Sequence, residues 1–152
     1  MIIKIPDKIL AKKLAVMDVG KIKNGEFNSL FLDMKRIMKE NQGVGLAANQ
    51  IGKDLAIFVI EETIAKESEI SEVYINPEIT EYSKDNDEME EGCLSIPEYY
   101  VPIKRSKKIK IKFINESGKK MKLKVRGFAA RVLQHETDHL NGLTIKTRAD
   151  EK

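Results

Sequence analysis

The sequence predicts an α+β fold, and three features support that class. Residues 104–126 alternate between apolar and basic side chains, a pattern typical of two β-strands that each keep one face in water. Apolar residues at helical spacing predict one amphipathic helix before these strands and another after them. Because helices and strands are segregated along the chain instead of alternating, a doubly wound parallel sheet is disfavoured. We expect one α+β domain that spans residues 1–152.

Both predicted helices have recognisable ends. In the first, apolar residues recur at steps of three and four over residues 26–41, and the helix should end before Gly43. The second should begin at Gly127 or Phe128 and end at Asn141–Gly142, a pair typical of a left-handed helix C-terminus.

The remaining segments before residue 104 predict strands and connections. Residues 55–60 and 73–76 are rich in β-forming side chains, and Pro77 should close the second run. The acidic, polar segments 61–72 and 81–90 suit exposed connections.

Residues 109–113 and 121–125 should form a hairpin through a turn at 115–119. The segment 104–126 holds eleven Lys or Arg residues and one acid. Most of this charge is explained if each strand of the hairpin exposes its lysines to water on one face. The alternative is a weak, salt-sensitive attraction to a polyanion such as RNA, without base readout.

Composition excludes several classes of protein. With 41% hydrophobic residues, 34% charged residues and a net charge of +3, the chain is not disordered or of low complexity. Its longest apolar run, residues 55–60, is far shorter than the ~20 residues of a membrane span, and residues 1–6 lack a signal-peptide pattern. We therefore expect a cytoplasmic protein that does not associate with membranes.

The chain has two histidines, and both lie in the segment His135–His139 of the second predicted helix. Residues four apart share a helical face, so the two imidazoles can bind one metal ion. Glu136 is then placed to take a proton from a water molecule that the ion activates. Phe128 and Val132 share the histidine stripe, so this face should be buried. The alternative is a histidine pair that binds no ligand.

A catalytic site of this type needs a third protein ligand, which should come from upstream of the helix. Downstream of His139 the carboxylates are Asp150 and Glu151, close to the chain end. Cys93 is the single cysteine, so it cannot form an internal disulfide, and Gly92 lets the backbone approach an ion. One thiolate and two imidazoles leave the fourth position open for water. The alternative is a buried thiol that only packs.

Residues 43–50 form a third motif, Gly-Val-Gly-Leu-Ala-Ala-Asn-Gln. Its spacing imitates a dinucleotide-binding loop, but that loop must leave a strand and open a helix, and here the predicted order is reversed. Small residues followed by the amide donor of Gln50 suit a loop beside a ligand's carbonyl group. Taken alone, the segment also fits a helix-to-strand turn that binds nothing.

Together, the segments 43–50, 91–95 and 134–140 resemble the three signature motifs of peptide deformylase in order and spacing. The resemblance extends along essentially the whole chain, and the short spacing from Cys93 to Arg105 looks like the commoner bacterial class. That family removes the formyl group from the N-formylmethionine of nascent chains. The resemblance thus implies a metal-dependent hydrolase of protein biosynthesis, with antiparallel sheets packed around a central metal-binding helix.

The resemblance also implies roles for individual residues. The metal ligands would be Cys93, His135 and His139. Glu136 would act as general base and then as acid, while Gln50 and the backbone N–H of Leu94 would hold the formyl oxygen. Substrate-binding residues would be Val44, Gly45, Phe128, Arg131 and Val132.

Within this substrate site, Gly45 would contact the substrate backbone and Arg131 would lie at the edge of the methionine pocket. Glu91 and Arg105 would form a structural ion pair. Tyr100 departs from the family, which often has an arginine there, so contacts to the peptide backbone at this position are in question.

The C-terminal segment also departs from the family pattern. Residues 143–147 replace the familiar Leu-Phe-x-Asp continuation, and no C-terminal helix is expected after Gly142. Ribosome docking through such a helix is therefore not expected.

For the cofactor we expect one divalent metal ion, natively Fe²⁺ by resemblance, with Zn²⁺, Ni²⁺ or Co²⁺ also accepted by this ligand set. The expected partners are N-formylmethionyl nascent peptides and, weakly, ribosomal RNA through the basic 104–126 hairpin. We expect a monomer.

Two rival functions remain. A metallopeptidase of the His-Glu-x-x-His type would leave Cys93 and Gln50 unexplained, and Glu136 argues against a non-catalytic metal- or RNA-binding module.

Overall fold

The structure is a computed structural model that describes residues 1–150. Two antiparallel sheets are present, which confirms the α+β class. The larger sheet has the order β1-β2-β3-β6-β7, with bounds Gly45–Ala47, Ile57–Ile60, Val73–Tyr82, Lys108–Ile114 and Lys120–Arg126. The smaller sheet pairs β4 (Asn86–Cys93) with β5 (Ile96–Ser106).

Within residues 1–150, five α-helices and two short 3-10 helices accompany the sheets. The α-helices are α1 (Val19–Lys23), α2 (Asn28–Glu40), α3 (Glu62–Ser68), α4 (Gly127–Leu140) and α5 (Ile145–Asp150). The 3-10 helices are η1 (Lys8–Ala11) and η2 (Ala48–Ile51). None of the helices in residues 1–150 is long and apolar enough to cross a membrane.

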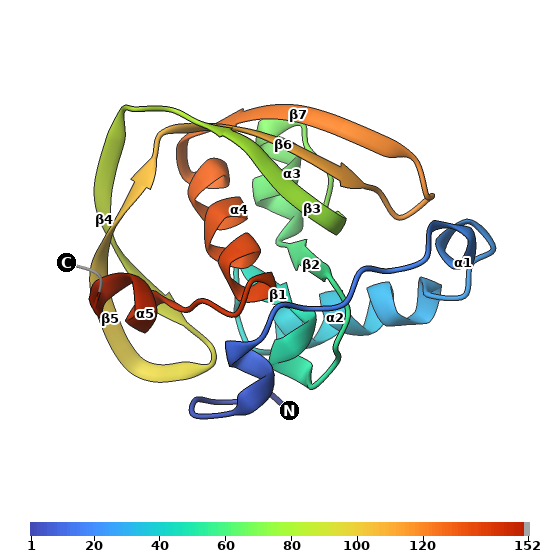
Figure 1. The fold of residues 1–152 in the computed structure, drawn as a ribbon, viewed down its shortest axis with the longest axis horizontal. Helices are drawn as coiled ribbons and strands as arrows, with labels where there is room; N and C mark the ends of the chain where they lie inside the picture. Colours follow the sequence, from blue (N-terminus) through green and yellow to red (C-terminus); the bar gives the residue numbers. More distant parts are fainter. Residues whose placement is uncertain (151–152) are drawn as a thin grey trace.

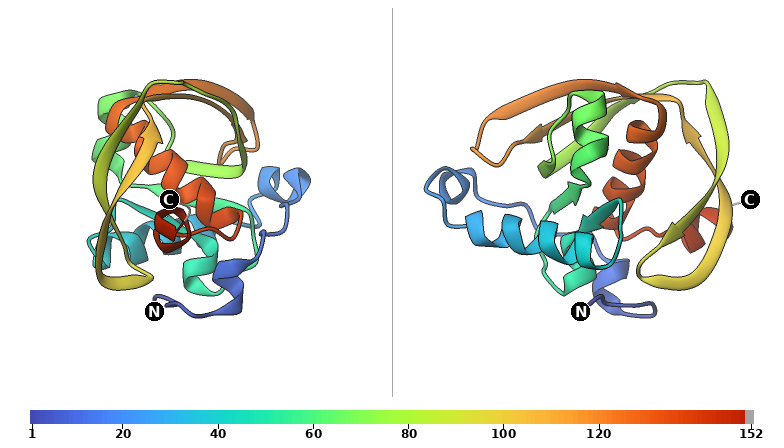
Figure 2. Two further views of the ribbon diagram at one scale, coloured as in Figure 1. Left: turned by 60° about the vertical axis from the view of Figure 1, so that its left-hand side comes forward. Right: turned by 180° about the vertical axis from the view of Figure 1, so that it is seen from behind.

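The helix α4 lies in the middle of the molecule, with β4 and β5 on one side and the larger sheet on the other (Figures 1 and 2). Eleven of its 14 residues are buried, including polar ones. Buried polar side chains require hydrogen-bond partners, so this helix must be surrounded by matching groups from both sheets. The expected arrangement of antiparallel sheets around a central helix is confirmed.

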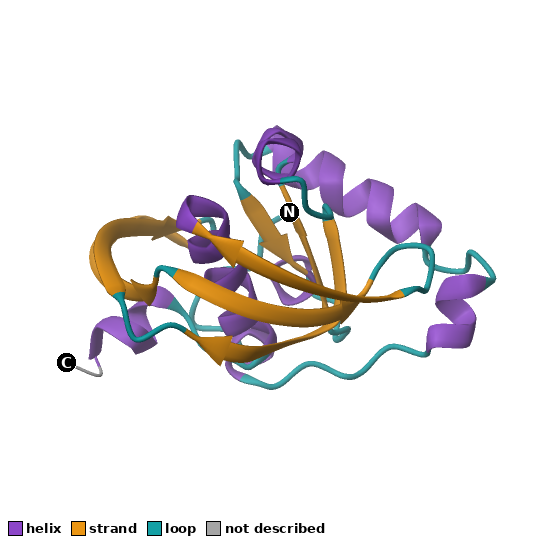
Figure 3. Ribbon diagram, turned by 90° about the horizontal axis from the view of Figure 1, so that it is seen from above, coloured by secondary structure: helices purple, strands orange, loops and turns teal. Residues whose placement is uncertain are grey.

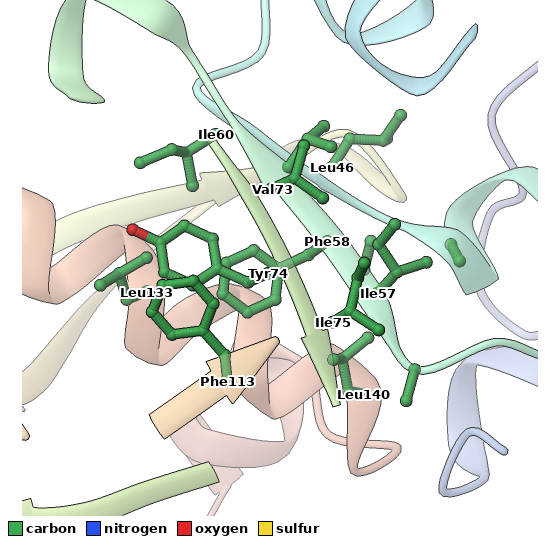
Figure 4. Packing of buried hydrophobic residues seen from close by; sticks show 14 of the residues in the cluster. Leu46, Ile57, Phe58, Ile60, Val73, Tyr74, Ile75, Phe113, Leu133 and Leu140 are labelled. Carbon is green, nitrogen blue, oxygen red and sulfur yellow. The ribbon is translucent and has the colours of Figure 1, made fainter. Parts of the chain in front are cut away.

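An aromatic cluster joins the larger sheet to α4 (Figure 4). The ring centroids of Phe58 and Tyr74 are 4.9 Å apart, and those of Tyr74 and Phe113 are 4.3 Å apart. Leu133 and Leu140 of α4 belong to the same buried core. Burial of such large apolar side chains supplies most of the favourable free energy of folding, and it fixes α4 against the sheet.

Both long helices and the hairpin agree with the sequence prediction. The helix α2 buries Phe31, Met34 and Met38 on one face. At the end of α4, Gly142 has a φ of 77° and lies so close to residue 11 that a Cβ atom would be 2.7 Å from its carbonyl carbon. Glycine is therefore required there by both conformation and space.

The hairpin β6–β7 turns its apolar side chains toward the core, where those of β6 and Val125 are buried and Met121 and Leu123 are half-buried, and it exposes its lysines. Two ion pairs join β6 to the neighbouring strand β3. Lys110 Nζ lies 3.0 Å from Glu81 Oε2, and Lys112 Nζ lies 3.2 Å from Glu78 Oε2, so the acids of β3 balance part of the basic charge of β6. The β7 lysines are exposed on the edge strand of the sheet. Charged side chains on an edge strand also discourage pairing with other chains.

Two segments that were predicted as connections are regular elements, so those predictions are wrong. Residues 61–72 contain α3, because the Glu61 side chain caps its first turn and Ala65 is buried. Residues 81–90 belong largely to β4 and the end of β3. In β4, Asp87 lies opposite Arg105 and Glu88 lies opposite Lys104 of β5 in the strand register. The acidic, exposed sequence of β4 resembles a loop because its pairing with β5 cannot be recognised from the segment alone.

Two predicted boundaries and one predicted turn are also wrong. The run 55–60 contributes a strand only from Ile57. Pro77 does not close the next strand, because a register shift between Ile75 and Glu78 lets β3 continue past it. The motif 43–50 is not a simple helix-to-strand turn, since it holds β1 and η2.

A C-terminal helix is present, contrary to the sequence prediction. In α5, Ile145 is buried, and the backbone N–H of Thr147 donates to the Thr144 hydroxyl at 3.3 Å. This helix lies beside β5, at the opposite end of the molecule from α1 (Figures 1 and 3). It forms because a hydroxyl caps its first turn and because Ile145 and Ala149 pack onto a small core beside β5.

Candidate metal centre and active site

The three predicted metal ligands come together where the smaller sheet meets α4. Cys93 ends β4, and His135 and His139 lie one turn apart on α4. Their ligand atoms all lie within 4.8 Å of one another, and the Cys93 Sγ atom is 3.3 Å from Nε2 of His139. This group of atoms is a candidate site for one metal ion.

A tight connection between β4 and β5 presents Cys93 to the helix. The register shifts after Gly92, so that Cys93 pairs with Ile96 only three residues later. A Cβ atom on Gly92 would overlap the ring of Tyr100, which lies across β4 at this point. Gly92 is therefore needed so that the Tyr100 ring can pack against the backbone of β4. This requirement is separate from the approach of the backbone to an ion.

His135 is oriented by a buried carboxylate. Its Nδ1 atom donates to Glu91 Oε1 at 2.9 Å, since an ionised carboxylate can only accept. This hydrogen bond leaves Nε2 of His135 free to face the ion. Arg105 binds Glu91 through Nε and Nη2 at 3.0 and 2.9 Å, which is the expected ion pair, and Arg131 donates to the same carboxylate.

The charge network continues to the C-terminal helix. Arg105 also donates to Asp138, and Arg148 of α5 donates to Asp138 Oδ1 at 2.7 Å. Burial alone would raise the pKa of Glu91, but His135 and Arg105 hold it well below its usual range. Burial would likewise raise the pKa of Asp138, and Arg148 and Arg105 lower it. Both carboxylates are thus charged and compensated.

The electrostatics of the ligand group suit a cation. Burial raises the pKa of the Cys93 thiol, yet His139 and hydrogen bonds from both histidines lower it to about 5. Burial lowers the pKa of His135, but hydrogen bonds to Cys93 and Glu91 and nearby negative charge raise it to about 10. An easily ionised thiol beside two imidazoles is a donor set that divalent ions favour, and binding of such an ion requires the thiolate form. The donor set fits such an ion.

Glu136 faces this group from the next position on α4. It is 3% exposed, its Oε2 atom is 3.9 Å from Nε2 of His135, and its Oε1 atom has no hydrogen-bond partner in the described chain. Burial raises the pKa of Glu136, which brings the carboxylate closer to the range that suits proton transfer at neutral pH. A buried oxygen without a partner is uncommon, because nearly all buried polar atoms form a hydrogen bond.

Gln50 reaches the same site from η2. Its side chain is buried, and Nε2 lies 3.7 Å from the Cys93 Sγ atom. The adjacent Asn49 was not predicted as a functional residue, but its Nδ2 atom donates to the backbone carbonyl of His139 at 2.8 Å. No local pattern could reveal this contact, because the two residues are 90 positions apart in the chain.

A cavity of about 420 Å³ opens beside these groups. All five residues predicted to bind substrate line it, namely Val44, Gly45, Phe128, Arg131 and Val132. Gln50, Cys93, Leu94, His135 and Glu136 line it as well. Motifs that are distant in sequence thus share one cavity.

One of these residues, Phe128, lies differently from its predicted position. Phe128 was expected on the buried face of the helix, but it is half exposed at the rim, because α4 has only just begun there. Arg131 lines the cavity as expected, and its guanidinium is held by other parts of the protein. It donates to Glu91, to the Ile103 carbonyl and to Asp87, because the buried carboxylate of Glu91 needs a further cation.

Comparisons with known proteins point in one direction. The sequence model of the polypeptide deformylase family matches residues 1–152. Peptide deformylase 1 of Clostridium perfringens is 45% identical over 137 residues, which cover 90% of this chain and 88% of that protein. The crystal structure of peptide deformylase from Thermotoga maritima matches with a TM-score of 0.88 at 38% identity, over 97% of this chain and 95% of that one.

A Met-Ala-Ser-bound crystal structure of a class I type b peptide deformylase from Acinetobacter baumannii matches equally well. Its TM-score is 0.88 at 30% identity, over 97% of this chain and 96% of that one.

Proposed function

This chain belongs to the peptide deformylase family and removes the N-formyl group from nascent peptides, and from that premise we propose how its residues divide the reaction. The observation that carries the proposal is the meeting of Cys93, His135 and His139 at a cavity that Glu136 and Gln50 also line. Family membership over the whole chain decides against the metallopeptidase and the non-catalytic binding module as functions.

Cys93, His135 and His139 would hold one divalent ion. When bound, the ion would polarise the formyl carbonyl and lower the pKa of a water molecule. We propose Fe²⁺ as the native metal, with Zn²⁺, Ni²⁺ or Co²⁺ in the isolated protein, because one thiolate and two imidazoles accept each of them.

Glu136 is proposed as the proton carrier. Its carboxylate accepts a proton from the attacking water, whose oxygen forms a bond to the formyl carbon. The same proton then passes to the leaving nitrogen as the carbon–nitrogen bond breaks. The products are formate and a peptide with a free amino terminus, so one water molecule is consumed for each formyl group.

Gln50 and the backbone N–H of Leu94 are proposed to hold the formyl oxygen as it gains negative charge. Nε2 of Gln50 lies beside Cys93, and Leu94 follows Cys93 in the chain, so both donors adjoin the ligand group. Donors that are already in place when charge develops stabilise the transition state more than water can.

The substrate class is N-formylmethionyl peptides. Val44, Phe128 and Val132 supply apolar lining for a methionine side chain, whose full burial contributes about 1.5–3 kcal/mol. The A. baumannii relative that binds Met-Ala-Ser supports a methionine-first peptide in this cavity. Gly45 and Arg131 line the same cavity and are proposed to shape it.

The decisive experiment measures formate release and new peptide fragments in parallel, with protein purified without oxygen. We expect formate from formyl-Met-Ala-Ser, clearly less from formyl-Gly-Ala-Ser, and little or none of the acetate that acetyl-Met-Ala-Ser would yield. The acetyl methyl group would collide with the groups around the formyl hydrogen. Internal fragments without formate would overturn the assignment.

We also propose a cytoplasmic monomer whose basic hairpin, residues 104–126, attracts ribosomal RNA weakly. The lysines of β7 are exposed on an edge strand, which supports a sequence-independent contact to phosphates. Co-sedimentation with ribosomes at rising salt tests this contact. We expect binding to weaken steeply with salt and after replacement of Lys120, Lys122 and Lys124 by glutamine, whereas salt-independent binding would contradict it.

A further inference from the structure

The amide of Gln50 is held at both ends within the protein. Its Oε1 atom accepts from the backbone N–H of Ala47 at 3.0 Å, and its Nε2 atom lies 3.1 Å from the Ser95 hydroxyl. A backbone N–H can only donate, so the atom that faces Ala47 must be the amide oxygen. This contact decides which end of the amide points toward Ser95 and Cys93.

Ser95 therefore accepts a hydrogen bond from Gln50. The NH₂ group of Gln50 only donates, so the Ser95 oxygen takes one of its two hydrogens. The two hydrogens of a primary amide diverge in one plane. With one of them on Ser95, the other is directed to the side where Cys93 Sγ lies 3.7 Å away.

Burial makes this arrangement rigid. Ser95 is 0% exposed and Gln50 is 2% exposed, so water does not replace the hydroxyl as an acceptor in the folded protein. Loss of the acceptor would leave a buried amide hydrogen unsatisfied, which is energetically costly. The Gln50 side chain would then rotate toward another acceptor.

The two backbones are tied together by a third segment. The N–H of Ile3 donates to the Gln50 carbonyl at 2.6 Å, and the N–H of Ile5 donates to the Ser95 carbonyl at 3.1 Å. Gln50 and Ser95 are 45 residues apart in sequence. The N-terminal segment thus bridges both loops and holds the spacing between the two side chains.

We propose that Ser95 is a positioning residue: by holding one Nε2 hydrogen of Gln50, it keeps the second one, which points to Cys93 Sγ, where it can donate to the formyl oxygen of a bound substrate. Ser95 belongs to the motif at 91–95, but neither metal binding nor proton transfer uses it. It does not line the substrate cavity, so it acts through Gln50 and not on the peptide. The inference rests on the role proposed above for Gln50.

A double-mutant cycle tests the proposal. The proteins are wild type, Ser95→Ala, Gln50→Ala and the double variant, with Ser117→Ala in the exposed β6–β7 turn as the matched control. For each, kcat and KM are measured with formyl-Met-Ala-Ser at equal metal content, together with the thermal unfolding midpoint.

We expect Gln50→Ala to lower kcat on the order of 10²-fold, as the loss of an oxyanion donor does. Ser95→Ala should lower kcat about five- to tenfold, as expected for one neutral hydrogen bond, with KM changed by less than about twofold. In the Gln50→Ala background, Ser95→Ala should have no further effect on kcat. Ser117→Ala should match wild type.

Nuclear magnetic resonance of the Gln50 side-chain amide gives a readout that does not depend on turnover. In wild type, its two hydrogens should be distinct and protected from exchange with water, and Ser95→Ala should increase their exchange rate.

An undiminished kcat in Ser95→Ala, or the same loss in the presence and absence of Gln50, would overturn the positioning role. An unchanged kcat in Gln50→Ala would instead refute the oxyanion role of Gln50. Failure of that role is thus distinguished from failure of the positioning role of Ser95, which leaves the effect of Gln50→Ala intact.

Discussion

The carboxylate of Glu136 packs directly against the backbone of Gly45, and no side chain fits between them. A Cβ atom on Gly45 would lie 2.6 Å from Glu136 Oε2, well inside the contact distance of the two atoms. The second glycine of the motif at 43–50 therefore makes room for the proposed proton carrier of α4. This role adds to the substrate contact that the resemblance implies for Gly45.

Gly45→Ala should displace Glu136 without removing a metal ligand. We expect kcat to fall on the order of 10²-fold, because a shift of about 1 Å misaligns the proton acceptor. Metal content should stay stoichiometric. Gly20→Ala on the exposed surface of α1 is the control, and both variants are compared by formate release and metal analysis. Full turnover in Gly45→Ala would show that the Glu136 position is not critical.

Glu136→Gln should separate chemistry from metal binding. The amide keeps the shape of the side chain but cannot accept a proton, so kcat should fall about 10²–10⁴-fold while the metal is retained. Cys93→Ala should lose both metal and turnover, because a ligand is removed. Metal analysis beside formate release decides the matter. Stoichiometric metal with normal activity in Cys93→Ala would refute the ligand assignment.

Oxygen should inactivate the iron form of the enzyme. Cys93 is a thiolate at neutral pH because its pKa is about 5, and thiolates oxidise more readily than thiols. Protein loaded with Fe²⁺ should lose activity in air, whereas the Ni²⁺ or Co²⁺ form should keep it. Activity is followed over hours with and without oxygen. An iron form that stays fully active in air contradicts the prediction.

Glu91→Gln should weaken both the fold and the metal site. Glu91 is 7% exposed and accepts from Arg105, Arg131 and His135, so its neutralisation leaves buried cations without their counter-charge. We expect unfolding free energy to fall by about 3–5 kcal/mol. Metal affinity should fall about 10–100-fold, because His135 loses the group that orients it.

Asp87→Asn is the matched control for Glu91→Gln. Asp87 also binds Arg131, but its side chain is 57% exposed, so its replacement should cost no more than about 1 kcal/mol. Chemical denaturation and competition for metal with a chelator measure the two effects. Equal losses in both variants would show that burial does not govern the contribution of Glu91.

Local patterns in the sequence were sufficient for the elements that follow a single periodicity. Apolar residues at helical spacing placed α2 and α4, and the alternation in 109–125 placed the hairpin. The sequence failed where structure depends on a distant partner. The acidic strand β4 forms because β5 pairs with it along its length, and α5 forms because Thr144 caps it and β5 covers Ile145.

The sequence by itself determined the chemistry of this protein. Two histidines four residues apart on a helix must share a face, and a single cysteine leaves few choices for a third soft ligand. Only the tertiary structure decided how these groups are supported. Glu91 holds His135, Gly45 makes room for Glu136, and Ser95 binds Gln50. Each pair is more than 40 residues apart in the chain, so the contact exists only once sheet register and helix packing bring the two segments together.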